Sequence, residues 1–309
     1  MRERRVAILG AGPVGLEAAL AASELGFPFT VYEAGADVAA NVRSWGHVRL
    51  FTPWSMNVSA RMRRALTRVG REVPGGGTCP TGRELVCEVL GPVASLPEIE
   101  PHVRRGSRVV EVGREGLLKS DEIGTGGRAG RPFRMLVRSD AGVEGLERAD
   151  VVLDCSGTWH NPNPLGAGGI RAPGEERADE HIVRRIPDLG ASRLEEGAPE
   201  WANRRILLVG AGHSAQTAAR DLHGLVERFP ETSVVWVIWS DRPDFGAVED
   251  DPLPEREALV RRAGELASGS SPFDVRPGRG VEALDVSADG VVVTLRSSAG
   301  GTERVTVDR

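Results

Sequence analysis

The sequence predicts an α/β protein built from two Rossmann-like units in tandem. Two stretches about 200 residues apart share one order of elements: a short apolar strand, a glycine-rich turn, a helix and a second strand. The strands are Val6–Leu9 and Phe29–Tyr32 in the first stretch, and Arg205–Val209 and Val234–Trp239 in the second. Each turn follows a strand directly and opens a helix, which is the arrangement that holds a dinucleotide in a βαβ unit.

Length, composition and charge are those of a globular protein of about two domains. The 309 residues are 40% hydrophobic and 27% charged, which is enough for a sizeable core. Acidic residues outnumber basic ones by 44 to 39, and the net charge of −5 gives no overall attraction to nucleic acid or to an anionic membrane. We therefore expect a small-molecule substrate, and neither nucleic acid nor membrane as a partner.

Several functional classes are disfavoured by what the sequence lacks. Lys119 is the only lysine, so Schiff-base chemistry and Walker-type phosphate loops are nearly excluded. The longest clear apolar run, Val234–Trp239, is far shorter than the roughly 18 residues of a membrane span, and no signal peptide is evident, so we expect a cytoplasmic protein. The three cysteines and six histidines show no metal-ligand spacing, and we expect no metal site.

The remaining elements follow from local pattern. Thr81–Leu90 is predicted to be a helix because Thr81 and Glu84 have the spacing of a capping box. Gly113–Arg131 is a glycine-rich loop, and the breaker residues of Trp159–Gly166 indicate a domain crossover. The other predicted helices are Leu16–Leu25, Ala215–Val226 and Leu253–Gly269, and the other strands are Arg108–Val112, Phe133–Arg138, Asp150–Asp154, Gly280–Asp285, Gly290–Arg296 and Glu303–Asp308.

The first glycine-rich turn has the spacing GxGxxG. Gly10 makes the tight turn, Gly12 and the adjoining Pro13 let the backbone approach a pyrophosphate, and Gly15 lets helix and strand pack closely. Glu33 ends the second strand about 20 residues further on, where a carboxylate accepts hydrogen bonds from both hydroxyls of an adenosine ribose. This turn is therefore predicted to bind an adenine dinucleotide.

The second turn has the looser form GxGxxA. Its candidate binding residues are Gly210, Gly212, His213, Ser214 and Ala215. The same stretch is similar to the GxSxG nucleophile elbow of hydrolases. Gln216, however, stands where the elbow needs its last glycine, and a hydrolase leaves the first turn unexplained.

The residues after Val234–Trp239 bear on the choice of coenzyme. Ser240 and Arg242 can bind a 2′-phosphate, and the strand does not end in an acid that would reject one. NADP is therefore favoured over NAD. Asp241 leaves the alternative open, because its carboxylate can instead accept a hydrogen bond from a ribose.

Four stretches together resemble a known family. These are 6–33, 154–158 (Asp-Cys-Ser-Gly-Thr), 161–164 (Asn-Pro-Asn-Pro) and 207–216. They look like the flavoproteins with two dinucleotide-binding domains, in particular the bacterial group similar to flavin-containing monooxygenases. The resemblance implies an FAD-binding domain over 1–164, an NADPH-binding domain inserted over 165–302, and a return to the FAD domain starting at 303–309.

The resemblance also places individual residues near FAD. Ser156 and Gly157 fall where the chain passes close to FAD, and Val110 falls where a backbone contact to the adenine is usual. Trp45 and His47 fall where the chain approaches the isoalloxazine. Core packing explains Trp45 and Trp54 equally well, and a structural hydrogen bond is the alternative for His47.

The implied activity is hydride transfer from NADPH to FAD, followed by oxygen activation as a C4a-hydroperoxide. We expect a monooxygenase that acts on a small nitrogen, sulfur or carbon nucleophile, with Asn57 as the candidate to hydrogen-bond the hydroperoxide. The alternatives are an NADPH-dependent reductase or dehydrogenase without oxygen insertion, and a non-catalytic protein or subunit of a split flavoprotein.

Three departures from the family limit this expectation. Gly174 and His181 stand seven residues apart, so the Baeyer–Villiger fingerprint is not present. The three cysteines include no close pair, which disfavours a thioredoxin-reductase-like role. Glu303–Asp308 resembles the strand that precedes the return to the FAD domain, so we expect that domain to be completed by a partner chain, a second copy or further sequence.

Overall fold

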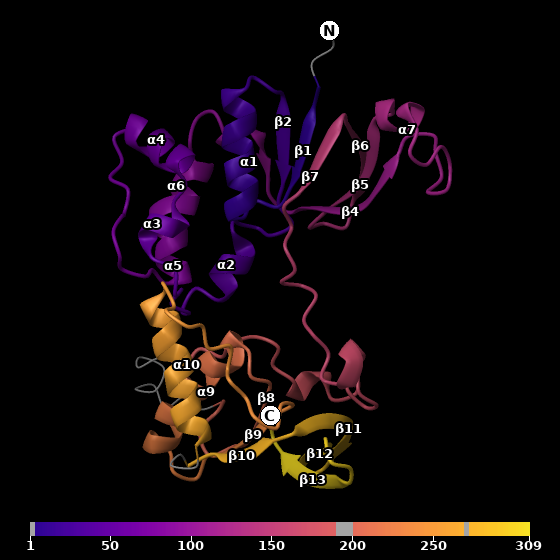
Figure 1. Ribbon diagram of the computed structural model, residues 1–309. Coiled ribbons are helices and arrows are strands. Elements are labelled where there is room, and N and C mark those ends of the chain that lie inside the picture. The colour runs from indigo at the N-terminus through magenta and orange to yellow at the C-terminus, as the bar shows by residue number, and fades with distance from the viewer. Residues whose placement is uncertain (1–3, 190–199, 269–271) are drawn as a thin grey trace. The chain divides into compact units, whose positions relative to one another are not determined.

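The computed structural model describes residues 4–189, 200–268 and 272–309, which form two compact units. The first unit is Met1–Trp159 and the second is His160–Arg309 (Figure 1). The division falls at the start of the breaker-rich stretch 159–166. Each unit has three layers: helices, a parallel sheet and an antiparallel sheet.

The parallel sheet of the first unit has the strand order β3-β2-β1-β7. Its strands are β1 (Val6–Leu9), β2 (Phe29–Tyr32), β3 (Val103–Arg104) and β7 (Val151–Asp154). Val6 pairs with Phe29 on one side and with Val151 on the other, so β1 is central and its carboxyl end lies between those of β2 and β7. A ligand that reaches this edge of the sheet meets the ends of three strands.

The two faces of this sheet carry different layers. Val6 and Ile8 pack in the cluster formed with the helices, whereas Ala7 and Leu9 pack with Met135 of the antiparallel sheet. The helices are α1 (Pro13–Glu24), α2 (Ala40–Ser44), α3 (Trp54–Asn57), α4 (Ala60–Arg68), α5 (Gly82–Leu85), a π-helical turn (Val86–Leu90), α6 (Gly91–Ala94), a 3₁₀ turn (Glu100–His102) and α7 (Gly126–Gly130). The antiparallel strands are β4 (Ser107–Arg114), β5 (Phe133–Ser139) and β6 (Glu144–Ala149).

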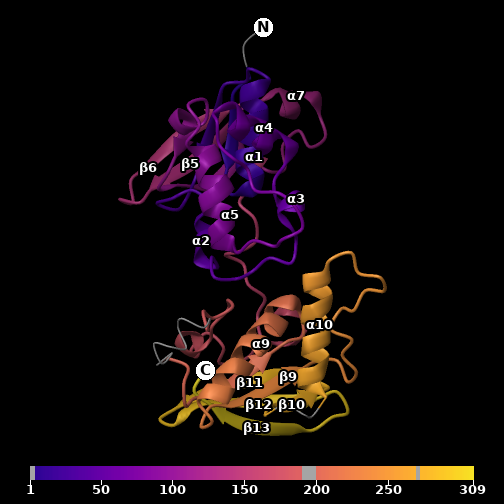
Figure 2. The same cartoon turned by 90° about the vertical axis from the view of Figure 1, so that its left-hand side faces the viewer.

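The second unit repeats this design. Its parallel sheet has the order β10-β9-β8 and contains β8 (Arg205–Val209), β9 (Ser233–Ile238) and β10 (Asp274–Pro277). Figure 2 shows the helices α9 (His213–Arg228) and α10 (Pro254–Ala267) on one face of this sheet and the antiparallel strands β11 (Arg279–Ser287), β12 (Gly290–Ser297) and β13 (Thr302–Val307) on the other. Ile206 packs with the helices, as Val6 does in the first unit. Leu207 packs with the antiparallel strands, as Ala7 does in the first unit.

The repeat extends beyond the glycine-rich turns. The backbone N–H of Arg5 donates to the Asp150 carboxylate at 2.8 Å, and the backbone N–H of Arg205 donates to the Asp308 carboxylate at the same distance. Two glycines have left-handed backbone at equivalent connections. Gly106, at φ +60°, links the parallel strand β3 to the antiparallel strand β4, and Gly278, at φ +63°, links β10 to β11. The two units therefore share the βαβ core, the antiparallel sheet and the connections between them.

Residues 303–309 differ from expectation. They were expected to begin the return to the FAD domain, but they belong to the second unit. Leu295 of β12 pairs with Glu303 of β13, and the Arg309 carbonyl accepts from the Leu207 backbone N–H at 2.9 Å. The physical reason is that β13 covers the second sheet, where Val307 is buried in the local core.

Two classes of element were not predicted. The strands β3, β6 and β10 were missed, and so were the short helices α2, α3, α4, α6 and α7. The predicted helix over 81–90 begins with the capping box, in which Thr81 and Glu84 exchange hydrogen bonds, but becomes π-helical after Leu85. Among the described residues, no helix combines the length and apolar character needed to cross a membrane.

Candidate functional site

The first glycine-rich loop is held against β7 by contacts that exclude side chains. Gly10 has φ +96°, and a Cβ at this position would lie 2.8 Å from the Cys155 carbonyl oxygen. A Cβ at Gly15 would lie 1.9 Å from the Gly10 carbonyl oxygen. A Cβ at Gly12 would meet no atom within 4 Å. The loop is thus packed tightly at both ends and open in the middle, where a pyrophosphate must approach the backbone.

Glu33 lies where β2 ends and is 8% exposed. Its Oε2 accepts from the backbone N–H of Ala11 at 2.8 Å, and its Oε1 accepts from that of Gly35 at 2.7 Å. Each carboxylate oxygen keeps a second lone pair. The carboxylate is therefore fixed beside the glycine-rich loop and can still accept from two ribose hydroxyls, which fits FAD.

The end of β7 lies next to the same loop. Cys155 contacts Gly10 through its carbonyl, and Gly157 has φ +68°. The Asp154 carboxylate accepts from the Ser156 hydroxyl at 2.6 Å and from its backbone N–H at 3.1 Å, and these hydrogen bonds lower the pKa of Asp154. Burial raises the pKa of the Cys155 thiol. The structure thus brings Ser156 close to Gly10, and the higher pKa disfavours the thiolate form of Cys155. A contact of Ser156 and Gly157 with FAD stays a prediction.

Two tryptophans near this unit's core pack against their surroundings. A Cβ at Gly82 would lie 2.7 Å from the Trp45 ring, so Gly82 is required for that ring to lie flat on the backbone. Trp54 is 9% exposed and belongs to the core. Within the described part of the chain, the buried Nε2 of His47 has no hydrogen-bond partner. An orphaned polar atom next to Trp45 is consistent with a ligand in this region.

Asn57 has a local role that does not support the expected one. Its side-chain amide donates to the carbonyls of Thr52 and Pro53 at 2.6 and 3.0 Å, and its Oδ1 accepts from the Thr52 hydroxyl at 2.9 Å. These bonds close the turn that starts α3. Both amide hydrogens of Asn57 and one lone pair of its Oδ1 are therefore used within the turn, and its role toward the hydroperoxide stays a prediction.

Val110 is the extra residue of a β-bulge. Val109 pairs with Val137 and Glu111 pairs with Leu136, so Val110 has no partner in the ladder. A bulged residue leaves backbone groups free for other contacts. The backbone contact of Val110 with the adenine, which the resemblance implies, stays a prediction.

The second glycine-rich loop borders a cavity. Gly210 has φ +108°, and Cβ atoms at Gly210 and Gly212 would meet nothing within 4 Å. Ala215 stands at the position that Gly15 holds in the first unit, in the first turn of α9. The cavity has a volume of about 210 Å³ and is lined by residues 211–213, Gln216, Ser240 and residues 243–246.

The end of β9 differs chemically from the end of β2. The backbone N–H of Gly10 donates to the Tyr32 carbonyl and that of Gly210 to the Val237 carbonyl, so Ile238 occupies the position of Glu33. Asp241 accepts from the Ser298 hydroxyl at 2.8 Å and is turned toward the β12–β13 connection. Ser240 lines the cavity, and the exposed Arg242 guanidinium makes no ion pair with any described residue. These residues fit NADP and give no support to Asp241 as a ribose ligand.

Ser214 lacks the partner that a hydrolase needs. It is exposed in the first turn of α9, and among the described residues no histidine hydrogen-bonds to its hydroxyl. The neighbouring Gln216 is 1% exposed and fills the position of the elbow's last glycine. The geometry does not assemble a nucleophile elbow.

The side chain of Asp251, which lies between β9 and α10, is buried. Its side chain is 2% exposed and accepts two hydrogen bonds of 2.7 Å from the Arg256 guanidinium. A third comes from the backbone N–H of Leu253 at 2.9 Å. The Arg256 contact is the main cause that lowers the pKa of Asp251, and His213 adds a smaller contribution. This cluster anchors the segment that follows β9 to the start of α10.

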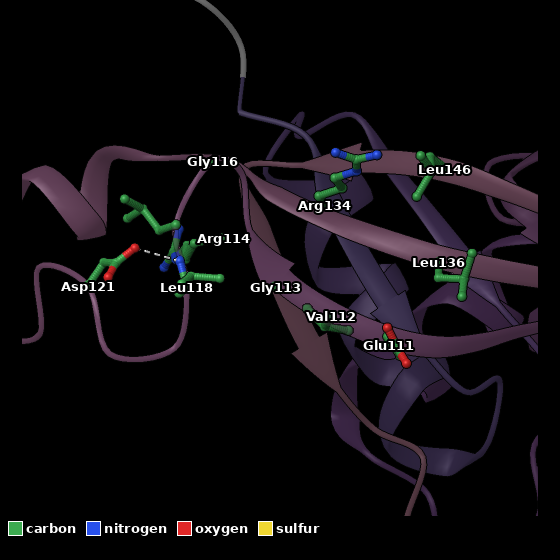
Figure 3. A pocket seen from close by; sticks show the side chains of 11 residues that line it. Glu111, Val112, Gly113, Arg114, Gly116, Leu118, Asp121, Arg134, Leu136 and Leu146 are labelled. Carbon is green, nitrogen blue, oxygen red and sulfur yellow. Dashed lines mark hydrogen bonds between the residues drawn. The ribbon is translucent and has the colours of Figure 1, made fainter.

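A larger cavity lies on the outer face of the β4–β6 sheet (Figure 3). It has a volume of about 440 Å³ and is lined by the sheet residues Val112, Arg134, Leu136 and Leu146 and by loop residues that include Asp121. Met135 and Val137 of the same sheet pack toward β1 and β2 instead. This cavity is therefore separate from the glycine-rich loop.

Within the described ranges, no three His, Cys, Asp or Glu residues are grouped so as to hold a metal ion.

Substitutions at Gly12 and Gly15 separate ligand binding from folding. Gly15→Ala should destabilise the first unit by about 1–3 kcal/mol, because the added Cβ collides with the Gly10 carbonyl. Gly12→Ala should fold normally and lose FAD, because its Cβ occupies only the space that the ligand needs. Thermal unfolding and flavin absorbance after gel filtration measure the two effects. Normal flavin content in Gly12→Ala would show that FAD does not bind this loop.

Asp251→Asn should lower the thermal stability at neutral pH and should have less effect in acid. Because Arg256 lowers the pKa of Asp251 in the folded chain, its contribution is present above the pKa of the unfolded chain and is lost as pH falls through the lower folded value. Tm should be lower than that of the wild type at pH 7, and the difference should shrink below about pH 4. Asp250→Asn, at an exposed neighbouring residue, is the control. A difference in Tm between the wild type and Asp251→Asn that stays constant from pH 7 to below about pH 4 would contradict this role of Asp251.

Comparison with known proteins identifies the fold. No protein-family model matches the chain, and no curated protein matches it. The bacillithiol disulfide reductase Bdr (YpdA) from Bacillus cereus matches with TM-score 0.67 and 18% identity over 99% of this chain and 76% of its own. DfoA, a cadaverine monooxygenase from Erwinia amylovora solved with FAD, matches with TM-score 0.66 and 12% identity over 100% and 77%.

A third solved structure has the same fold. The ornithine N-hydroxylase KtzI from Kutzneria sp. 744, solved with reduced FAD and NADP⁺, matches with TM-score 0.64 and 15% identity over 99% of this chain and 79% of its own. These matches confirm the fold class predicted from the sequence. The chain has the tandem Rossmann-like fold of FAD-dependent pyridine nucleotide oxidoreductases.

Proposed function

We propose that this protein is an oxidoreductase that binds FAD in its first unit and NADPH in its second, and that transfers hydride from NADPH to FAD. The observation that carries the proposal is the contrast between two equivalent positions. Glu33 ends β2 with a fixed carboxylate, whereas Ile238 ends β9 and is followed by Ser240 and Arg242. Two duplicated loops with opposite chemistry toward a ribose 2′ position call for two different dinucleotides.

The first unit suits FAD because the adenosine ribose of FAD carries a free 2′-hydroxyl. A carboxylate at Glu33 accepts from that hydroxyl and repels a 2′-phosphate. The open space at Gly12 and the start of α1 at Pro13 place backbone N–H groups toward the pyrophosphate. The orphaned Nε2 of His47 would gain a partner from a bound ligand.

The second unit suits NADPH because the exposed guanidinium of Arg242 makes no ion pair with any residue that the structure describes. Arg242 forms a charge-assisted hydrogen bond with a 2′-phosphate, and Ser240 can donate to the same group. The start of α9 after Gly212 faces the pyrophosphate in the manner of α1. The two cofactors supply the electron transfer, and the protein binds and orients them.

We further propose a monooxygenase that acts on a small nitrogen, sulfur or carbon nucleophile. DfoA and KtzI, which share the fold, are a cadaverine monooxygenase and an ornithine N-hydroxylase. The second candidate is a reductase without oxygen insertion, which is favoured by the likeness to a bacillithiol disulfide reductase. Within the described residues, neither Cys87 nor Cys155 forms a disulfide, so neither supplies a disulfide that could accept electrons.

Anaerobic mixing with NADPH tests the shared part of the proposal. The absorbance of bound FAD should bleach with NADPH and much more slowly with NADH. Failure of NADPH to reduce the flavin would contradict the proposed activity. Admitting oxygen then separates the candidates. A reductase should release about one hydrogen peroxide per NADPH at once. A monooxygenase should release little hydrogen peroxide and should transfer the oxygen atom when a nucleophile is supplied.

Arg242→Ala should raise the Michaelis constant for NADPH roughly 10- to 100-fold, because a charge-assisted hydrogen bond contributes about 1.5–3 kcal/mol. The constant for NADH should change little, since NADH has no 2′-phosphate. Arg304→Ala, which removes an exposed arginine outside the cavity, is the matched control. If NADH is the better substrate of the unmodified protein, the assignment of Ser240 and Arg242 is wrong.

A further inference from the structure

The cavity of the second unit is bordered by two separate segments of the chain. One is the glycine-rich loop with the first turn of α9, which contributes residues 211–213 and Gln216. The other follows β9 and contributes Ser240 and residues 243–246. We call residues 240–246 the coenzyme segment. Its first residues are those that the proposed function assigns to the 2′-phosphate, so its conformation decides whether they reach that group.

Gln216 joins the two segments. Its Nε2 donates to the Ala211 carbonyl at 2.8 Å and to the Phe245 carbonyl at 2.8 Å. Both hydrogens of the amide are therefore used, one on each border of the cavity. Because both partners are carbonyl acceptors, the amide has one orientation that satisfies them.

The oxygen of the same amide has no protein donor. Gln216 is 1% exposed, and its Oε1 accepts no hydrogen bond from any residue that the structure describes. An unsatisfied buried acceptor destabilises the folded chain.

The coenzyme segment holds a backbone conformation that needs support. Phe245 has φ +56°, a left-handed conformation that a residue with a Cβ rarely adopts, and Gly246 follows at φ +73°. The Phe245 ring packs on Trp236 with ring centroids 5.5 Å apart, while Gln216 holds the Phe245 carbonyl. At the other end, the backbone N–H of Arg242 donates to the Ser240 hydroxyl at 3.2 Å.

We propose that Gln216 is a positioning residue for coenzyme selectivity. Its amide N–H groups hold the coenzyme segment in the conformation in which Ser240 and Arg242 recognise a 2′-phosphate. The inference rests on the proposed function, because it takes the second unit to be the NADPH site. It goes further by assigning selectivity to a buried residue that need not touch the phosphate.

Two nucleotides that differ only in the 2′-phosphate provide the test. The FAD-loaded protein is titrated with 2′,5′-ADP and with 5′-AMP by isothermal calorimetry, which measures binding without turnover. Wild type should bind 2′,5′-ADP at least about 10-fold more tightly, as expected for one charge-assisted hydrogen bond. Gln216→Met should reduce this preference about 10-fold and leave the affinity for 5′-AMP within about 3-fold.

Gln216→Glu separates shape from hydrogen bonding. Glutamate has the size of glutamine but, when ionised, has no N–H to donate to the two carbonyls. It should lose the preference as Gln216→Met does, and it carries the test alone if the methionine variant does not fold. Thr217→Val is the matched control: Thr217 is 8% exposed, and its hydroxyl donates within α9 to the His213 carbonyl. The control should lower stability without changing the preference.

Each outcome bears on a different claim. Unchanged preference in both Gln216 variants, or an equal loss of affinity for both nucleotides, would overturn the positioning role while leaving the NADPH site intact. No preference for 2′,5′-ADP in the wild type would overturn the coenzyme assignment and the inference with it. Loss of preference in Thr217→Val as well would show that general loosening of α9 is the cause.

Discussion

The structure depends on the close approach of one loop to the end of one strand. In the first unit the Gly10 carbonyl lies so near Gly15 that a Cβ there would come within 1.9 Å, and the Cys155 carbonyl closes on Gly10 from β7. Backbone packed this tightly leaves side chains no room at the sheet edge. The start of α1 is thereby aimed at the space beside Gly12, and Glu33 is fixed next to it by the Ala11 backbone N–H.

The second unit keeps this scaffold and changes its chemistry. Its faces alternate as in the first unit, with Ile206 toward the helices and Leu207 toward the antiparallel strands. Ala215 replaces the closing glycine, and Ile238 replaces the carboxylate. In the proposed function, the carboxylate of Glu33 selects FAD and the guanidinium of Arg242 selects NADPH, so charge rather than shape distinguishes the two dinucleotides.

The sequence predicted the elements whose pattern is local. Val6–Leu9, Phe29–Tyr32 and Arg205–Val209 are short apolar runs beside glycines, and all three occur with the predicted bounds. The strand Glu144–Ala149 was missed because it is mostly exposed and its sequence, EGLERA, has neither an apolar run nor an alternation of polar and apolar residues. The site residues within the glycine-rich loops were visible in the same way. The burial of Gln216 was not, since its partner Phe245 is brought to it by tertiary packing. The burial of Asp251 was not either, because its contact with Arg256, five residues further on, depends on a loop conformation that no local pattern specifies.

Counting the dinucleotides bound to one chain tests the central claim most directly. Equilibrium dialysis with FAD alone, NADP⁺ alone and both together measures the stoichiometry and any competition. The account predicts one FAD and one NADP⁺ per chain, with neither displacing the other. Displacement of FAD by NADP⁺, or saturation at a single dinucleotide per chain, would contradict the assignment of two different coenzymes to the two duplicated loops.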